Sequence, residues 1–353
     1  MYQFLPALVV GVMPWVTQEV RIPGFTAEPI DDLLVRDRES LLQAINHSLR
    51  FMNTPQAQGR YPLAGISHDR VRRSLLRLGE LLQTVRDVRE LQQHLAREFV
   101  LLKVSDRVLF TGYYEPVFRA SRVRTAEFPY PLYRLPPDFA SWAKPHPTRA
   151  ELETSDRLWG LEIAWLADPF TAFLVHVQGS ARLDLGNGQV LTVGFAGRTD
   201  HPYTSVGREL VKDGKMRLEE VTLQRLQAYF QEHPQDLIPY LHRNKSFIFF
   251  RETNGQPATG SLGVPVTPER TIATDKSLFP PGAIALIHTE LPFPDGKGGY
   301  TKRRVSRLVL DQDTGSAIRG LERVDIFMGT GQVAQERAGL ITSRGTLYYL
   351  LLR

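Results

Sequence analysis

The sequence predicts a mainly β protein with helices in its N-terminal part, which places it in the α+β class. Three observations predict this class. Residues 28–99 carry apolar side chains at helical spacing. At Val108 the spacing changes to that of strands rich in β-branched and aromatic residues. From Phe247 onward, short strand-like runs alternate with turn clusters, a pattern typical of strands that close into a barrel.

The N-terminal helices are predicted from apolar stripes and from residues that can start a helix. One stripe, at the spacing of a single amphipathic helix, consists of Leu41, Leu42, Ile45, Leu49 and Met52. Ser67 can cap a second helix and Asp87 can start a third, because their side-chain oxygens accept hydrogen bonds from the free N–H groups of a first turn. We expect the Arg-rich opposite faces of these helices to face solvent.

The middle of the chain combines strands, loops and further helical segments. Val108–Phe118 has the composition of a strand whose end lies at an edge or a turn because of Pro116. We expect residues 172–183 to form a strand, a polar corner and a second strand. Residues 128–147 are Pro-rich and irregular, and much of residues 204–230 has helical spacing.

Length, charge and cysteine content limit the possible functions. A chain of 353 residues is long for a single core, so we expect two domains or one domain with a large insertion. The net charge is only +5, and no DNA- or RNA-binding motif is present, so a nucleic-acid partner is not expected. Cysteine is absent, which excludes disulfides, thiolate metal sites, thiol nucleophiles and a cysteine that carries a lipid.

The first residues leave two alternatives open. Residues 1–16 contain an apolar run of signal-peptide length, but no Lys or Arg precedes it and no small-x-small cleavage site follows it. They are therefore either a degraded export signal or a first strand of the fold. The rest of the sequence contains no run approaching the roughly 20 apolar residues of a transmembrane helix.

Several common catalytic arrangements are missing from the sequence. There is no His-Glu-x-x-His, no phosphate-binding loop and no Gly-x-Ser-x-Gly, and the nine His residues lack ligand spacing. We expect no metal and no cofactor. His176, in an apolar stretch, is expected to be a satisfied core residue. What remains is acid/base chemistry by carboxylates.

The candidate carboxylates lie in residues 310–331, where Asp311, Asp313 and Asp325 occur in or beside strand-like runs. Asp is normally depleted in strands, so these residues need a reason. One interpretation is structural, with Asp313 opening a turn and Asp325 paired with an arginine. The other is that Asp325, between Val324 and Ile326, has a raised pKa and works as a catalytic acid/base.

Aromatic and polar side chains offer surfaces for a sugar ligand. Aromatic rings that could stack on sugar rings are those of Tyr113, Tyr114, Tyr203, Phe249, Phe250, Phe327 and the four Trp residues. Each aromatic residue taken singly is expected to lie in the core. Gln178, Ser180 and Asn187 could bond hydroxyl or acetamido groups. The corner Gln178-Gly179-Ser180 is the most suggestive, because a buried turn would struggle to satisfy an amide and a hydroxyl together.

Six motifs in a consistent order, from about residue 110 to 352, resemble the MltA family of membrane-bound lytic murein transglycosylases. They are Gly112-Tyr113-Tyr114-Glu115-Pro116, residues 175–183, His201-Pro202-Tyr203-Thr204-Ser205-Val206-Gly207, Phe249-Phe250-Arg251-Glu252, residues 260–267, and residues 312–325, which match the family's "3D" region. The resemblance implies a double-psi β-barrel domain, from residues 1–107 plus 245–353 with the N-terminal helices. A β-rich substrate-binding domain, residues 108–244, would be inserted into it, with a glycan groove between the two.

The resemblance also implies an activity. Family members cleave the β-1,4 bond between N-acetylmuramic acid and N-acetylglucosamine in peptidoglycan and leave a 1,6-anhydromuramyl end. A single Asp acts first as acid and then as base, since the sugar's own C6 hydroxyl replaces water. By resemblance, Asp325 takes this role and Asp313 supports it. Gln178, Ser180 and Tyr113 would bind substrate. Asp311 can equally well be explained as a strand-edge residue, so no role in the site is assigned to it.

Two departures from the family and several rivals bear on these expectations. Family members are typically lipoproteins, whereas this sequence has no cysteine to acylate, so we expect envelope localisation, in the periplasm or at the outer membrane, and leave anchoring open. We expect a monomer with peptidoglycan glycan strands as its partner. A water-using muramidase or glucanase would share the groove. The alternative from another class is a non-catalytic peptidoglycan-binding or expansin-like wall-loosening protein.

Overall fold

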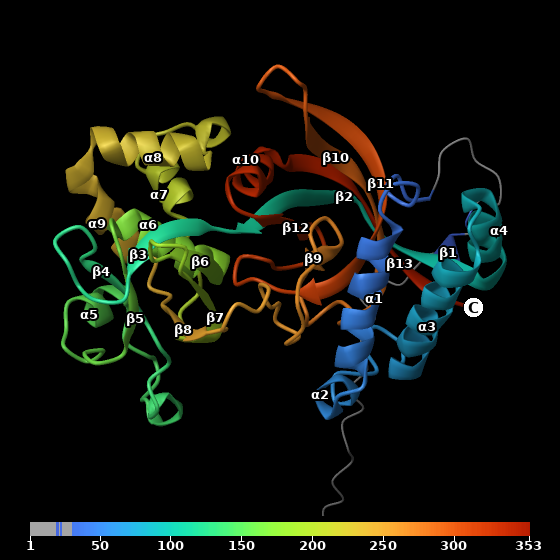
Figure 1. Ribbon diagram of the computed structural model, residues 1–353, viewed down its shortest axis with the longest axis horizontal. Coiled ribbons are helices and arrows are strands. Elements are labelled where there is room, and N and C mark those ends of the chain that lie inside the picture. Colours follow the sequence, from blue (N-terminus) through green and yellow to red (C-terminus); the bar gives the residue numbers. More distant parts are fainter. Residues whose placement is uncertain (1–18, 21, 23–29) are drawn as a thin grey trace, which may run out of the picture.

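The computed structural model describes residues 19–20, 22 and 30–353. Both alternatives for residues 1–16 therefore lie outside the described residues. The described chain builds two separate β-sheets, each with its own helices, which lie side by side along the long axis of the molecule (Figure 1). Within this described part, no helix combines the length and the apolar character that crossing a bilayer demands.

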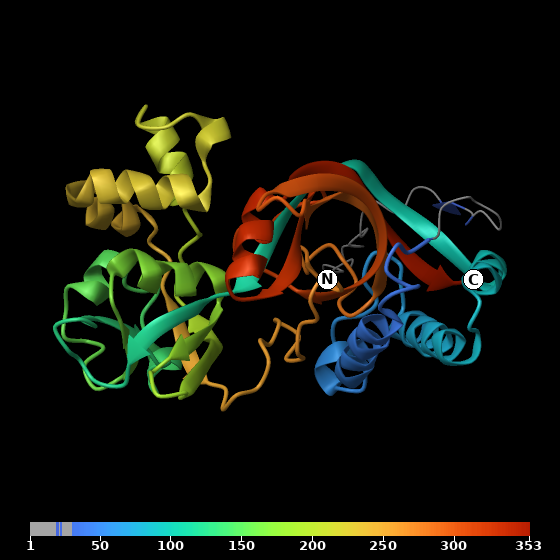
Figure 2. The same cartoon turned by 45° about the horizontal axis from the view of Figure 1, so that its top comes forward.

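The first sheet closes into a barrel. Its strand order is β1-β2-β12-β9-β11-β10-β13, and β2 also pairs with β13, so that six strands form a ring (Figure 2). The strands are β1 (Glu19–Val20), β2 (Phe99–Glu115), β9 (Thr271–Ala273), β10 (Ile284–Pro294), β11 (Tyr300–Asp313), β12 (Arg323–Thr330) and β13 (Thr342–Leu352). The closed barrel predicted from the strand pattern is confirmed, and the double-psi connection stays a prediction.

Helices cover the barrel on two sides. α1 (Arg38–Met52), α2 (Pro55–Gln58), α3 (His68–Thr84) and α4 (Val88–Glu98) precede β2 in the chain. The predicted helix starts are present: the Ser67 side chain accepts from Arg70 N at 3.2 Å, and that of Asp87 accepts from Glu90 N at 2.8 Å. α10 (Gln332–Leu340) lies on the side of the barrel that faces the second sheet (Figures 1 and 2).

The second sheet has the order β4-β5-β3-β6-β7-β8. Its strands are β3 (Val117–Ser121), β4 (Tyr130–Tyr133), β5 (Glu162–Leu166), β6 (Ser180–Asp184), β7 (Val190–Arg198) and β8 (Ile248–Glu252). Its helices are α5 (Arg149–Glu153), α6 (Pro169–Gln178), α7 (Val206–Lys212), α8 (Leu223–Glu232) and α9 (Pro234–Arg243). This sheet and these helices bury three apolar clusters that are separate from the core around the barrel.

The chain passes between the sheets twice. β2 runs without a break across residue 108 and pairs with β12 as far as Glu115, while β8 pairs with β7 as far as Glu252. The sequence placed the limits of the inserted domain after residues 107 and 244. The strands that connect the two sheets continue beyond both positions, to Glu115 and Glu252. At the first crossing, the buried Glu115 carboxylate accepts from Thr330 Oγ1 of the barrel at 2.7 Å and from Arg182 Nε of the second sheet at 2.9 Å.

The hairpin expected at residues 172–183 is wrong in its first half. Residues 169–178 form helix α6, with Asp168 as its N-cap, accepting from Thr171 N at 2.8 Å, and Pro169 in its first turn. Gly179 ends the helix with a φ of 77°, which glycine adopts without strain. The apolar run carried no strand alternation, and the Asp-Pro start was the signal for a helix.

Candidate active site

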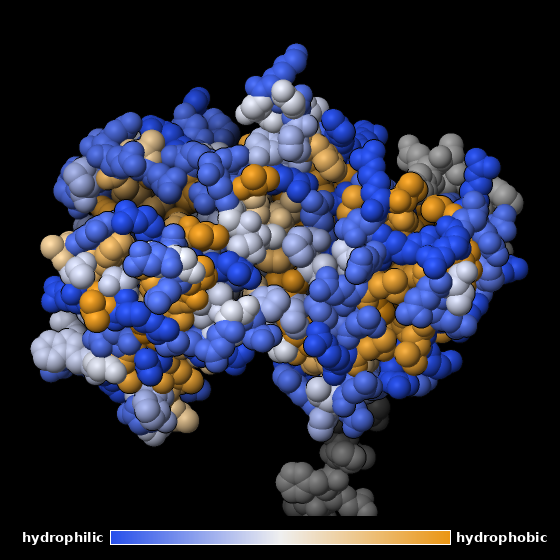
Figure 3. All heavy atoms as spheres, in the orientation of Figure 1, coloured by the Kyte–Doolittle hydropathy of each residue, from blue (hydrophilic) through white to orange (hydrophobic). Residues whose placement is uncertain are grey.

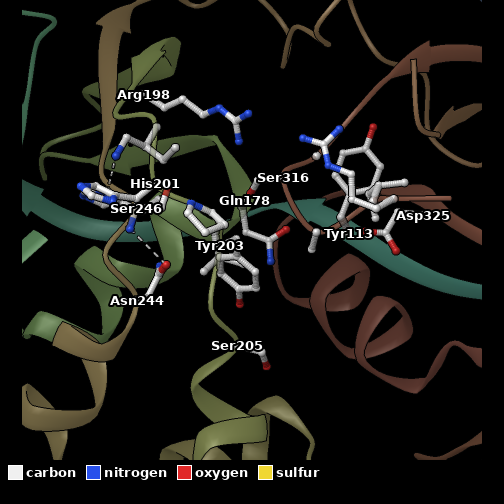
Figure 4. Close-up of a pocket in the computed structure, with 18 of the residues that line it drawn as sticks. Tyr113, Gln178, Arg198, His201, Tyr203, Ser205, Asn244, Ser246, Ser316 and Asp325 are labelled. Carbon is white, nitrogen blue, oxygen red and sulfur yellow. Dashed lines mark hydrogen bonds between the residues drawn. The ribbon is translucent and has the colours of Figure 1, made fainter. Parts of the chain in front are cut away.

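A polar groove lies between the two sheets. It has a cavity of about 770 Å³ and an adjoining one of about 590 Å³, and the two share lining residues that include Tyr113, Gln178, Arg198 and Asp325. The molecular surface is indented between the part built on the second sheet and the part built on the barrel (Figure 3). Side chains from both parts point into this space in the close-up (Figure 4).

Asp325 lies in the barrel wall of the groove. It is in β12, opposite Thr111 of β2 and Ala273 of β9. Its side chain is 19% exposed, and Arg323 Nη2 lies 3.5 Å from Oδ1, a loose ion pair that leaves Oδ1 without a hydrogen-bond partner among the described residues. Burial raises the pKa of Asp325 to about 6, against the lowering effect of the Arg323 cation. A large fraction of this carboxyl is therefore protonated in mildly acidic solution.

Asp313 is held differently. Its Oδ1 accepts from the backbone N–H groups of Ser261 and Thr314, each at 2.8 Å, and its Oδ2 accepts from the Tyr113 hydroxyl, also at 2.8 Å. Burial raises the pKa of Asp313 and these three donors oppose the shift. Both oxygens are thus engaged, which suits Asp313 to organise the site and not to exchange protons.

The strand β9 separates the two aspartates. Ala273 of β9 pairs with Asp313 on one side and with Asp325 on the other. Two inter-strand spacings put the Cα atoms of Asp313 and Asp325 at about 10 Å from each other. Besides burial, the Asp313 carboxylate also raises the pKa of Asp325.

Tyr113 links the two aspartate positions. It pairs with Phe327 in the β2–β12 register, and the two ring centroids lie 5.2 Å apart. Burial, with the nearby Asp313 carboxylate, raises the pKa of the Tyr113 hydroxyl well above its usual range. The hydroxyl therefore stays protonated and can act as a hydrogen-bond donor to Asp313.

Thr111 is a groove residue that the sequence reasoning missed. It lies directly opposite Asp325 and lines the larger cavity, and its Oγ1 is buried without a hydrogen-bond partner among the described residues. A buried polar atom is normally paired, so an unpaired one beside a groove indicates a place for a ligand. The signal in the sequence was its spacing of two from Tyr113, which puts both side chains on one face of β2.

Gln178 and Ser180 lie where the sequence predicted a binding corner. Gln178 is the last residue of α6 and Ser180 the first of β6, and both line the smaller cavity. The Gln178 Oε1 accepts from the backbone N of Tyr114 at 3.2 Å, so its amide NH₂ remains to meet a ligand. Figure 4 shows the Gln178 side chain between the two walls of the groove. Their binding roles stay predictions.

Other candidates lie away from the groove. Tyr114, Phe249 and Phe250 are buried in the core, and Asn187 lies in the turn between β6 and β7 with a φ of 52°. Core packing accounts for the three aromatic rings, as expected for an aromatic residue taken singly, and turn geometry accounts for Asn187.

Asp311 and His176 are both satisfied inside the protein. Asp311 is fully buried, pairs with Lys276 and accepts from Tyr349 Oη at 2.7 Å, so it is no strand-edge residue. His176 is in a helix and not a strand, but it is a satisfied core residue as predicted: its Nδ1 accepts from Ile248 N at 3.1 Å.

Asp275 was also missed by the sequence reasoning. Its Oδ2 accepts from Gly320 N at 3.0 Å, and Arg319 Nη1 lies 3.7 Å from its Oδ1. These contacts hold the loop between β11 and β12 against the barrel. Within the part of the chain that the structure describes, no group of three or more His, Asp or Glu side chains is arranged to hold a metal ion.

Comparisons with known proteins agree with this arrangement. Residues 109–251 match the MltA-specific insert domain, and residues 270–351 match the 3D domain. Membrane-bound lytic murein transglycosylase A of Escherichia coli K12 is 33% identical over 245 residues, which cover 69% of this chain and 65% of that protein. The matched part thus spans slightly less than two thirds of that relative.

Solved structures extend the likeness over nearly the whole chain. Escherichia coli MltA with bound chitohexaose is 26% identical, with 95% of each chain covered and a TM-score of 0.74. The lytic transglycosylase LtgG of Burkholderia pseudomallei is 34% identical over 81% of this chain and 87% of that chain, with a TM-score of 0.53.

The fold and the site define a class of protein in which a closed barrel and a second sheet enclose a polar groove with a protonatable aspartate in its wall. The chain belongs to the MltA family, with a C-terminal 3D domain.

Proposed function

We propose that this protein is a lytic transglycosylase that cleaves the β-1,4 bond between N-acetylmuramic acid and N-acetylglucosamine in peptidoglycan. The observation that carries this proposal is the state of Asp325. It is a groove carboxyl with a pKa raised to about 6 and with one oxygen that accepts no hydrogen bond from the described residues. The names of the relatives support the substrate class.

The proposed reaction uses Asp325 twice. The protonated carboxyl first donates its proton to the glycosidic oxygen, and the bond from C1 of the muramyl unit to that oxygen breaks as positive charge develops on C1. The C6 hydroxyl oxygen of the same sugar then attacks C1. The Asp325 carboxylate takes the hydroxyl proton, which restores the starting acid and leaves a 1,6-anhydro ring. No water is consumed.

The surrounding residues have supporting parts in this proposal. Asp313, fixed by three donors, orients Tyr113 and the end of β11. Thr111, Gln178 and Ser180 present a hydroxyl, an amide and a second hydroxyl along the groove, groups that suit sugar hydroxyls and acetamido groups. Because the proposed substrate is the cell wall, we propose that the protein works in the cell envelope. We also propose that it acts as a monomer.

The structure favours this reaction over a hydrolytic one. A glycoside hydrolase needs a second carboxylate as nucleophile or as base for water. The acidic residues that line the cavities are Asp200, Asp313 and Asp325. Both oxygens of Asp313 are engaged, and hydrogen bonding to His146 N lowers the pKa of Asp200. Asp313 is thus held by its donors, and Asp200 is held by the backbone of His146 on the second-sheet wall, whereas Asp325 lies in the barrel wall.

Replacement of the proposed acid tests the assignment. Asp325→Asn keeps the shape of the side chain but cannot donate and then accept the proton, so the release of soluble muropeptides from sacculi should fall about 10²- to 10⁴-fold. Circular dichroism and an unfolding curve should show a folded variant. Wild-type turnover in folded Asp325→Asn would contradict the assignment. Glycan binding by wild-type protein with no release at all would favour the non-catalytic alternative.

A further inference from the structure

The second-sheet wall of the groove carries three arginines whose side chains have no ion-pair or hydrogen-bond partner among the residues that the structure describes. Arg208 of α7 lines the larger cavity, Arg251 of β8 lines the smaller one, and Arg198 of β7 lines both. None of the three side chains has an ion pair or a hydrogen bond to another residue of the described chain. The arginines therefore follow the groove over the length of both cavities.

The cations on the barrel wall are in a different state. Arg323 lies by Asp325, Arg319 by Asp275, and Lys276 pairs with Asp311. On the second-sheet wall, the acidic groove residue is Asp200, and His146 holds it through its backbone N at 2.9 Å. Within the described part of the chain, no carboxylate forms an ion pair with Arg198, Arg208 or Arg251.

The direction of Arg198 fits a ligand between the walls. Its side chain starts from the second sheet, and its guanidinium end points into the space in front of the barrel (Figure 4). A guanidinium binds carboxylates through two parallel N–H bonds and is desolvated more easily than an ammonium. An unpaired arginine that reaches into a groove is therefore suited to a carboxylate on the ligand.

We propose that Arg198, Arg208 and Arg251 bind the carboxylates that hang from the muramyl residues of the glycan strand. This inference rests on the proposed function. The sugar rings of such a strand are neutral, but every second sugar carries a lactyl group, which is either a free carboxylate or joined to a peptide stem with carboxylates of its own. A row of separated cations along one wall matches a polymer whose charges recur at intervals.

Binding measurements with three ligands test this inference. Asp325→Asn serves as the background, because it keeps the ligand uncut. The ligands are strands with peptide stems, strands freed of peptide by an amidase, and neutral chitohexaose. In this background, Arg198→Gln, Arg208→Gln and Arg251→Gln should each weaken binding of a carboxylate-bearing strand about three- to fivefold, and chitohexaose binding by less than about twofold. Weakening with the peptide-free strands alone assigns the lactyl carboxylate, weakening with the stem-bearing strands alone assigns the stem carboxylates, and weakening with both shows that the arginines accept either carboxylate.

Two controls isolate the effect of position. Arg89→Gln removes the same charge from an exposed site on α4, away from the groove, and should change no affinity. Raising the salt from about 50 to about 300 mM should weaken binding of the charged strands and not of chitohexaose. The proposal would be overturned if the three Arg→Gln variants lost as much affinity for chitohexaose as for the charged strands, or lost no affinity for the charged strands. Product masses from the wild-type enzyme report separately on the proposed reaction.

Discussion

At the scale of single residues, the pKa of Asp325 governs the pH dependence of activity. The acid step needs the protonated carboxyl, whose pKa burial raises to about 6. We expect kcat/KM to be level below that pH and to fall about tenfold per unit above it. Steady-state rates on soluble glycan strands across this range would show the profile.

The neighbour of Asp325 supplies a control for that profile. The Arg323 cation lowers the pKa of Asp325, so Arg323→Gln should move the break in the profile to higher pH. An unshifted break in folded Arg323→Gln, or a wild-type kcat/KM that rises between pH 5 and 7, would contradict the role of Asp325 as an acid.

The ionised form of Asp325 should also lower the free energy of unfolding of the protein. A carboxyl whose pKa rises from 3.8 to about 6 on folding binds more protons in the folded state, so stability falls as the pH rises through that window. At neutral pH, ionised Asp325 costs about 3 kcal/mol. Asp325→Asn should therefore raise the free energy of unfolding at neutral pH and leave it nearly unchanged below pH 3.8. Urea unfolding at the two pH values measures this, and an equal gain at both would refute the electrostatic cause.

At the scale of elements, the contact between β2 and α10 shapes the barrel wall of the groove. Gly112 lies between Thr111 and Tyr113, and a Cβ there would meet Ala338 Cα at 2.7 Å and Ile341 Cδ1 at 3.0 Å. Gly112→Ala should displace α10, cost about 1–3 kcal/mol and lower kcat/KM. Chemical denaturation and rates on one preparation give both values.

A second glycine is the matched control for Gly112. Gly79, inside α3, would place its Cβ 3.7 Å from Ile45 Cγ2, an ordinary contact, so Gly79→Ala should stabilise by about 0.5–1 kcal/mol. If Gly112→Ala were as well tolerated as Gly79→Ala, the tight packing of α10 on β2 would not matter to the site.

The elements also show which parts of the fold the sequence could predict. Helix caps at Ser67 and Asp87 were predictable, because a cap is a local interaction. The strands of the barrel were predictable as strands, and their closure followed from number and spacing. The helix at residues 169–178 was misread, because a continuous apolar run does not distinguish a buried strand from a buried helix.

At the scale of the whole molecule, the site exists only where the two sheets meet. Asp325 was predictable as a candidate because an aspartate between apolar strand residues is rare, and Asp313 was predictable as its support only through the family resemblance. Thr111 and the arginines of the opposite wall were not, since their role comes from register and from the placement of one sheet against the other. The spacing of Thr111 from Tyr113 is visible in the sequence, but the placement of one sheet against the other leaves no local signal.

The product of cell-wall digestion tests the central claim most directly. Purified sacculi are digested with the wild-type protein, with Asp325→Asn as the blank, and the soluble muropeptides are weighed by mass spectrometry. If the sugar's own C6 hydroxyl attacks C1 in place of water, the products should be lighter by one water than those of a muramidase. Products of the hydrated mass would contradict the account, because they would require a water nucleophile in this groove.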